Sequence, residues 1–252
     1  MAWFEQGPTR IYYEESGDGD PLLLLPGWGG SIDEFSPLRD ALSNSFRVIA
    51  ADCPGSGKSG PQPRTYTPTY YQDDARTFLA MLESLGANHA RAVGFSDGGE
   101  YELLMATMKP DAIRALATWG AAGSLGTHAE MADMMTTVVD SPIPPMEGFS
   151  QYLKTTYGED NARIMTQSAG KSFRSIIEAG GDISLSRAGS ISCHALLITG
   201  ENDFLAAPPM VSELARAIPN GEFIEAKGAG HPVHLEQPEW LVDTITGWLA
   251  KH

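Results

Sequence analysis

The 252-residue chain has only two cysteines, Cys53 and Cys193. Cys53 follows one predicted strand and Cys193 precedes another, so in a parallel sheet they would lie at opposite edges. A five-residue strand spans about 16 Å, whereas a disulfide requires Cα atoms within about 7 Å of each other. We therefore expect two free thiols, as is usual in a reducing compartment.

Long apolar runs and positive charge are also scarce. The densest apolar run, residues 22–25, is far too short to span a bilayer. The first residues lack the basic and apolar stretches of a secretory signal, so we expect a soluble cytoplasmic protein. The chain has 17 lysines and arginines and 32 aspartates and glutamates, which gives a net charge of −15 at pH 7. Such a surface repels nucleic acid and anionic membranes, so neither is expected as a partner. The charge is compatible either with simple solubility or with a cationic substrate.

Strand and helix signals alternate along most of the chain. The Gly-Asp-Gly-Asp turn signal at residues 17–20 suggests a hairpin between the first two predicted strands. Repeated strand–helix units predict a mostly parallel sheet with helices on both faces. The strands are expected at residues 10–15, 22–25, 47–51, 90–95, 113–118, 195–199 and 222–225.

The alternation stops between residues 121 and 189. This stretch is helix-prone and contains five of the ten methionines. We interpret it as an insertion over one edge of the sheet, which leaves residues 1–120 and 190–252 as the α/β core.

The sequence Gly94-Phe95-Ser96-Asp97-Gly98-Gly99 closes an apolar strand and opens a helix predicted from about residue 98 to residue 109. This is the context in which Gly-x-Ser-x-Gly forms a nucleophile elbow. The turn is so tight that glycines must flank the serine. Ser96 would stand at the start of the helix, where the helix dipole favours negative charge. Without further support, the motif is also compatible with an ordinary strand–helix turn.

A serine hydroxyl needs a base, and the base needs an acid that orients it. In this arrangement the chain order is serine, acid, histidine, and Asp203 and His231 each follow a predicted strand. The carboxyl ends of parallel strands share one edge of a sheet, so both can meet Ser96 there. Glu201 is the alternative acid and His234 the alternative base. The two histidines have no third ligand near them, so we expect no metal site.

Attack on an ester creates an oxyanion, which preset N–H groups must stabilise. The backbone of Asp97 should supply one N–H group. Residues 26–30, Pro-Gly-Trp-Gly-Gly, follow an apolar strand and should supply the other from Trp28. The alternative is a simple glycine turn.

Residues 55–59, Gly-Ser-Gly-Lys-Ser, look like part of a phosphate-binding loop. That motif requires a glycine where this chain has Asp52, and a carboxylate there would repel phosphates. No nucleotide is expected.

Together these motifs resemble the α/β-hydrolase family from about residue 10 to the C-terminus. The resemblance implies an eight-stranded, mostly parallel sheet, with residues 121–189 as a helical cap over the active site after the sixth strand. It implies a hydrolase that needs no metal or organic cofactor. The family's oxyanion loop often has histidine where this chain has Pro26, which changes the support of that loop.

Within the family, the Ser96 elbow and Trp119-Gly120-Ala121 resemble the valacyclovir hydrolase (biphenyl hydrolase-like) branch. In that branch, the aspartate after the nucleophile is associated with the amino group of amino-acid esters. Carried over, Asp97 would bind a cationic substrate group; the alternative is that it supplies only its N–H group or caps the helix.

We therefore expect a monomeric or homodimeric serine esterase that acts on a small molecule by acyl transfer. The same triad could instead act on carbon–carbon bonds, lactones, thioesters or peroxide. A receptor that binds a ligand without catalysis is the alternative from another class. The residues expected to contact substrate are Asp97, Trp28, Met131, Met135, Phe149 and Tyr152, where flexible methionines suit varied ligands.

Overall fold

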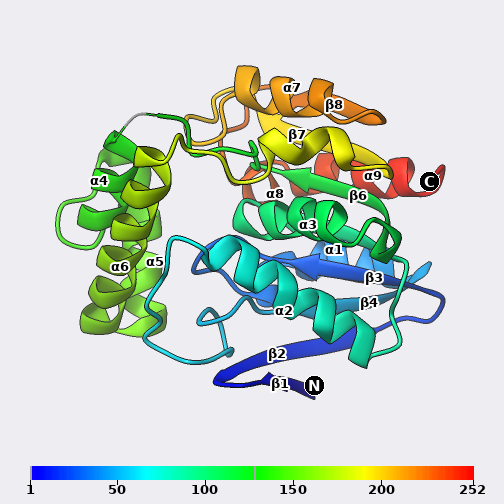
Figure 1. The fold of residues 1–252 in the computed structure, drawn as a ribbon, viewed down its shortest axis with the longest axis horizontal. Coiled ribbons are helices and arrows are strands. Elements are labelled where there is room, and N and C mark those ends of the chain that lie inside the picture. Colours follow the sequence, from blue (N-terminus) through cyan, green and yellow to red (C-terminus); the bar gives the residue numbers. More distant parts are fainter. Residues whose placement is uncertain (1, 128) are drawn as a thin grey trace.

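The computed structural model describes residues 2–127 and 129–252. Through these residues runs an eight-stranded sheet with the order β1-β2-β4-β3-β5-β6-β7-β8 (Figure 1). Strands β3 to β8 are parallel, and β1 and β2 extend the sheet antiparallel at one edge. The predicted mostly parallel sheet is thus confirmed. The strands are β1 (Ala2–Gln6), β2 (Thr9–Ser16), β3 (Asp20–Leu25), β4 (Phe46–Ala51), β5 (Ala90–Phe95), β6 (Ile113–Trp119), β7 (His194–Gly200) and β8 (Gly221–Ala226).

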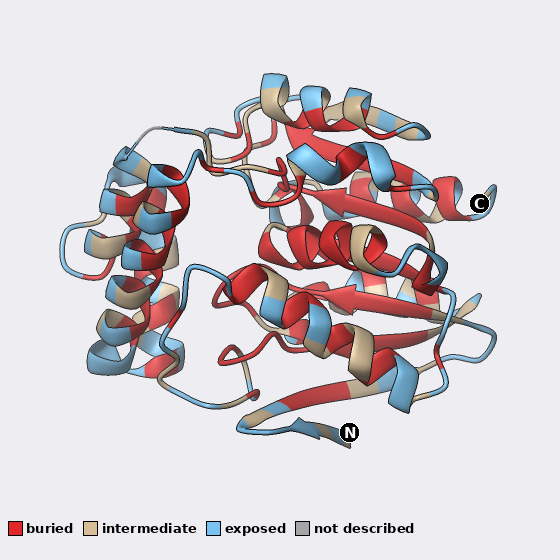
Figure 2. Cartoon of the chain, viewed as in Figure 1, coloured by how far each residue is buried: buried red, intermediate tan, exposed pale blue. Residues whose placement is uncertain are grey.

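Helices cover both faces of the sheet. Side chains of α1 and α9 pack on one face with Leu22 and Leu24, and those of α2, α3 and α7 pack on the other with Leu23 and Leu25. Buried residues follow the strands and the inner sides of these helices (Figure 2). No helix within the described ranges is both long and apolar enough to cross a membrane. The helices are α1 (Ser36–Ser43), α2 (Tyr70–Ser84), α3 (Asp97–Met108), α4 (Glu130–Thr137), α5 (Glu147–Tyr157), α6 (Glu159–Glu178), α7 (Pro208–Ala217), α8 (Val233–Glu236) and α9 (Pro238–Leu249).

The expected hairpin between residues 10–15 and 22–25 is wrong. Strand β2 pairs with β1 and β4, whereas β3 lies between β4 and β5. The four leucines of β3 are completely buried, and an unbroken apolar run is stable only where helices cover both faces. The hairpin partner of β2 is instead β1, which the sequence analysis did not predict.

The break in the alternation corresponds to three helices, α4, α5 and α6, between β6 and β7. They lie together beside the sheet (Figure 1). Helices α4 and α6 approach closely at Gly170, where a Cβ atom would come within 2.0 Å of Thr136 Oγ1 and 2.8 Å of the carbonyl oxygen of Ala132. Met165 and Met135 are buried in the apolar interior that these helices share with the core.

The two cysteines are free, as their predicted positions required. Cys53 is buried after β4, and its thiol donates to the carbonyl oxygen of Pro26 at 3.4 Å. Cys193 directly precedes β7.

One carboxyl group lies in the core without a partner. Glu102, on α3, is fully buried, and neither of its carboxyl oxygens has a hydrogen bond to any described residue. Its Cδ would lie 2.8 Å from a Cβ atom at Gly94, so it packs directly against β5. Burial raises the pKa of Glu102 well above its ordinary value, so the neutral acid is the form that the fold accommodates.

This burial predicts a pH-dependent stability. Because the pKa of Glu102 is higher in the folded than in the unfolded state, its contribution is present at low pH and is lost as pH rises. We expect Glu102→Gln to raise the free energy of unfolding by about 2 kcal/mol at pH 8 and to change it little at pH 4.5. Urea titrations at the two pH values measure the difference. Glu178→Gln, at an exposed position on α6, controls for the loss of one negative charge; an equal effect of both substitutions would contradict the prediction.

Candidate active site

Ser96 lies at the bend between β5 and α3 with φ +52° and ψ −118°. A positive φ is unfavourable for a residue with a side chain, and such strain occurs mostly at functional sites. The flanking glycines are required sterically: a Cβ atom at Gly94 would lie 2.7 Å from the carbonyl carbon of Gly98, and one at Gly98 would lie 2.5 Å from the carbonyl oxygen of Leu25. The N–H of Ser96 donates to the carbonyl oxygen of Trp119 at 2.8 Å, which fixes the bend to β6.

His231 connects Ser96 to Asp203. Its Nε2 lies 3.2 Å from Ser96 Oγ, and its Nδ1 lies 2.8 Å from Asp203 Oδ2. Asp203 follows β7 and His231 follows β8, so the structure brings the three predicted residues together at the carboxyl edge of the sheet. The side chain of Asp203 is fully buried, while 14% of the His231 side chain is exposed.

Several hydrogen bonds keep Asp203 ionised. Burial alone would raise the pKa of Asp203, but the hydrogen bond with His231 and the N–H groups of Ala206 and Leu205 hold it below its ordinary value. These two N–H groups donate to Oδ1 at 2.9 and 2.8 Å. An ionised Asp203 can only accept at Oδ2, so His231 Nδ1 carries the proton. Nε2 is then the atom free to receive the proton of Ser96.

The position of His231 also depends on Gly120. This glycine has φ +70°, and a Cβ atom there would lie 2.8 Å from Cε1 of His231. On another side, the ring of Phe95 lies 4.9 Å from the imidazole. The sequence analysis quoted Gly120 only as part of a family motif; its contact with the histidine becomes visible only in three dimensions.

The alternative acid and base have other partners. Glu201 is exposed, pairs with Lys227 and accepts the N–H of Gly228 at 2.9 Å. His234 is buried on α8, where its Nδ1 accepts the indole N–H of Trp119 at 3.1 Å. Burial lowers the pKa of His234, although Glu34 opposes this shift.

The two residues predicted to bind the oxyanion are both near Ser96: Asp97 follows it in the chain, and a Cβ atom at Gly27, next to Trp28, would lie 3.2 Å from Ser96 Cβ. Asp97 is the first residue of α3, and the first N–H groups of a helix have no partner within it. The N–H of Trp28 makes no turn or loop hydrogen bond within the described residues. Its loop closes with the N–H of Gly30 on the carbonyl oxygen of Gly27 at 3.0 Å. Asp52 stands where a phosphate-binding loop would have a glycine. Its carboxylate accepts the N–H of Ile32 at 2.8 Å, so it holds the segment after the Trp28 loop.

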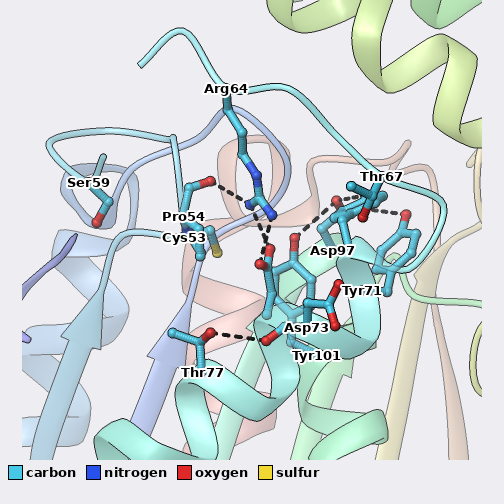
Figure 3. Close-up of polar contacts among 12 residues, drawn as sticks. Cys53, Pro54, Ser59, Arg64, Thr67, Tyr71, Asp73, Thr77, Asp97 and Tyr101 are labelled. Atoms are coloured by element: carbon cyan, nitrogen blue, oxygen red, sulfur yellow. Dashed lines mark hydrogen bonds and ion pairs between the residues drawn. The ribbon is translucent and has the colours of Figure 1, made fainter. Parts of the chain in front are cut away.

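The carboxylate of Asp97 is buried among tyrosines. Its oxygens accept the hydroxyl of Tyr70 at 2.8 Å and that of Tyr71 at 2.9 Å, with Tyr101 at 3.4 Å. Arg64 reaches down from its loop toward the same cluster (Figure 3). Burial raises the pKa of Asp97 to about 6, against the effect of the two tyrosine hydrogen bonds. Each carboxylate oxygen of Asp97 thus already accepts a hydrogen bond from a tyrosine hydroxyl in this structure.

The other residues predicted to contact substrate lie in different surroundings. Trp28 and Phe149 have rings 6.1 Å apart in an edge-to-face arrangement beside the site. The indole N–H of Trp28 is buried without a partner among the described residues. The hydroxyl of Tyr152 donates to Glu34 rather than standing free. Met135 is buried and Met131 partly buried on α4, within the apolar core of the insertion.

Among the described residues, one group could share a metal ion. His194, Glu222 and His252 offer ligand atoms within 4.8 Å of one another. His194 is the first residue of β7 and Asp203 follows the last, so this group lies at the opposite end of the strand from the Ser96 site.

A mostly parallel eight-stranded sheet with a strained serine after a central strand defines the class of α/β hydrolases. The chain belongs to the alpha/beta hydrolase family, whose model matches residues 22–244. The protein called Serine hydrolase BPHL from Homo sapiens is 27% identical over 237 residues, 90% of this chain and 75% of that protein. This similarity confirms the resemblance to the valacyclovir hydrolase branch.

Solved structures show the same fold. An enol-lactonase from Burkholderia xenovorans LB400 superposes with a TM-score of 0.76 at 22% identity, covering 99% of this chain and 100% of that one. A thermophilic esterase from Thermogutta terrifontis also gives 0.76, at 21% identity and 96% and 94% coverage.

The contact at Gly120 predicts a specific defect. We expect Gly120→Ala to slow the labelling of Ser96 by a fluorophosphonate at least tenfold, because the new methyl group displaces His231 and small misplacements are costly. The labelling rate is measured by mass spectrometry of the intact protein.

Gly86→Ala is the matched control. Gly86 also has a positive φ, +61°, but no atom lies within 4 Å of its Cβ position. Both substitutions strain the backbone, so both should lower stability, whereas only Gly120→Ala should slow labelling. Equal labelling rates in the two variants would show that Gly120 does not position the histidine.

Proposed function

We propose that the protein is a serine hydrolase that cleaves a carboxylic ester of a small molecule through an acyl-enzyme. The observation that carries the proposal is the continuous hydrogen-bonded path from Asp203 through His231 to Ser96, at a strained bend. Nucleophile, base and orienting acid within hydrogen-bond reach are what acyl transfer requires. Binding of a ligand alone would not require the strained φ of Ser96.

In the proposed mechanism, His231 Nε2 removes the hydroxyl proton as Ser96 Oγ attacks the carbonyl carbon. The resulting oxyanion accepts hydrogen bonds from the N–H groups of Trp28 and Asp97. His231 then gives the proton to the leaving alcohol as the ester bond breaks. Water, deprotonated by His231, attacks the acyl-enzyme. The bond to Ser96 Oγ then breaks, His231 returns the proton to Ser96, and the acid is released. Asp203 stabilises the imidazolium in both steps, and no cofactor is needed.

Helices α4 to α6 form the proposed cap, residues 121–189. Helix α5 places Phe149 beside Trp28, so the insertion approaches the loop that would hold the oxyanion. A cap at this position would exclude water from the site and strengthen its electrostatic interactions. The acyl or alcohol group would contact the partly buried aromatic side chains there.

The same mechanism would also cleave acyl compounds related to open-chain esters. The relatives named above include a serine hydrolase, an enol-lactonase and an esterase. A lactone is an internal ester and needs the same chemistry, so we propose that small lactones are the second substrate class to test.

The primary test is Ser96→Ala. We expect hydrolysis of p-nitrophenyl acetate to fall by at least about 10³-fold, with an unchanged circular dichroism spectrum. Ser190→Ala, an exposed serine, should retain full activity. Unchanged turnover in Ser96→Ala would remove Ser96 from the mechanism. A wild-type protein that neither turns over the ester nor reacts with a fluorophosphonate would favour the receptor alternative.

Asp97→Asn tests charge recognition. Because both oxygens of Asp97 already accept tyrosine hydroxyls, we propose that it acts through its N–H group and its packing. Asp97→Asn should therefore change kcat/KM for amino-acid esters and for neutral esters of the same size by similar factors. A loss at least tenfold larger for the amino-acid esters would instead assign Asp97 to binding the cationic group.

A further inference from the structure

Helix α5 of the insertion packs against the loop that carries Trp28 and forms a hydrogen bond with it. Tyr157, the last residue of α5, is buried, and its hydroxyl donates to the carbonyl oxygen of Gly29 at 2.8 Å. The same hydroxyl accepts the N–H of Gly57 at 2.8 Å. One side chain therefore joins the insertion, the Trp28 loop and the loop after β4.

A second polar contact runs through Glu34. Its Oε1 accepts the hydroxyl of Tyr152 at 3.0 Å and the N–H of Ser31 at 2.9 Å. Its Oε2 lies 3.7 Å from Nε2 of His234. Burial would raise the pKa of Glu34, but His234, the N–H of Ser31 and Tyr152 hold it below its ordinary value. The charged carboxylate thus connects α5 to the far end of the same loop.

Apolar contacts complete the interface. Leu153 lies 3.0 Å, and Phe149 3.8 Å, from the Cβ position of Gly29. Phe149, Leu153 and Tyr157 are spaced four residues apart, so they share one face of α5. This face lies on the loop, and a side chain at Gly29 would crowd Leu153.

The loop has one internal hydrogen bond, from the N–H of Gly30 to the carbonyl oxygen of Gly27. It contains three glycines among residues 27–30, and Gly29 has φ +71°. Glycines leave the backbone free to adopt several conformations, whereas an oxyanion donor must stay within about 3 Å of the developing charge. The core restrains the loop through Asp52 at Ile32 and through the Cys53 thiol at the carbonyl oxygen of Pro26; between these two points, α5 supplies the hydrogen bond to the carbonyl oxygen of Gly29.

We propose that Tyr157 and Glu34 are positioning residues. Through their hydrogen bonds, α5 packed on the loop holds the N–H of Trp28 in the orientation that binds the oxyanion. The proposal rests on the proposed function. It makes the second oxyanion donor dependent on the insertion, so that the site is complete only when α5 lies on the loop. Movement of α5 to admit a substrate would loosen this donor, and its return would restore it.

The test compares Tyr157→Phe and Glu34→Ala with the wild-type protein on p-nitrophenyl acetate. We expect kcat to fall about tenfold in each, less than the 10²–10³-fold cost of losing a donor completely, with KM changed less than twofold. The Ki of a trifluoromethyl ketone, which forms an oxyanion on the serine, should rise by the same factor as kcat falls. Glu34→Gln keeps an acceptor for Ser31 and Tyr152 and should recover most of the activity, so the test does not depend on Tyr157→Phe folding.

Ser172→Ala is the matched control for a loosened insertion. Ser172, on α6, donates to the carbonyl oxygen of Thr67 at 2.8 Å, a contact between insertion and core away from the Trp28 loop. It should leave kcat and Ki unchanged. The proposal is overturned if Ser172→Ala loses as much as the two variants, or if both variants keep wild-type kcat and Ki. An inactive wild-type protein would refute the ester hydrolase itself, a separate result.

Discussion

The hydrogen bond between His231 and Asp203 is the interaction on which the rest of the site depends. It fixes which imidazole nitrogen carries the proton and thereby which one faces Ser96. The bond needs a buried carboxylate that stays ionised, and two backbone N–H groups after Asp203 meet that need. It also needs an imidazole ring that can adopt the orientation facing both Asp203 and Ser96. Gly120 leaves space for this orientation because it has no Cβ atom.

The same edge of the sheet carries several buried acids, among them Asp97, Glu100 and Asp203. Glu100, on the first turn of α3, accepts the N–H groups of Ala122 and Gly123 and the hydroxyl of Ser184. Burial raises the pKa of Glu100 to about 7 despite these bonds. The contacts fasten both ends of the insertion to α3, the helix that begins directly after Ser96. Asp97 on the same turn is held by tyrosines of α2, so α3 is anchored from two sides.

Two of the places where the insertion meets the core lie beside the Ser96 site. Near α3 it is fastened by Glu100, whereas at the Trp28 loop it is held by α5 through Tyr157 and Glu34. Residue 26, which is histidine in many family members, is proline here and offers no side-chain hydrogen bond to the loop. In this chain, residues from outside the loop's own sequence provide the restraint. Under the proposed mechanism, substrate entry and the completion of the oxyanion site would both involve helix α5.

By itself, the sequence determined seven of the eight strands and the motifs. Local steric requirements restrict which residue types a position can have, so they can be recognised in the sequence. Glycines flank Ser96 because any side chain there would collide with the backbone. The leucines of β3 are stable only where helices cover both faces of the sheet. The order serine, aspartate, histidine, with the last two each following a strand, was enough to predict which side chains would converge. Tertiary structure alone decided the strand order, because β2 and β3 are joined by a turn yet separated by β4. It also decided the partners of Asp97, Tyr152 and Tyr157, since hydrogen bonds between residues 26 to 128 positions apart leave no local pattern in a single sequence.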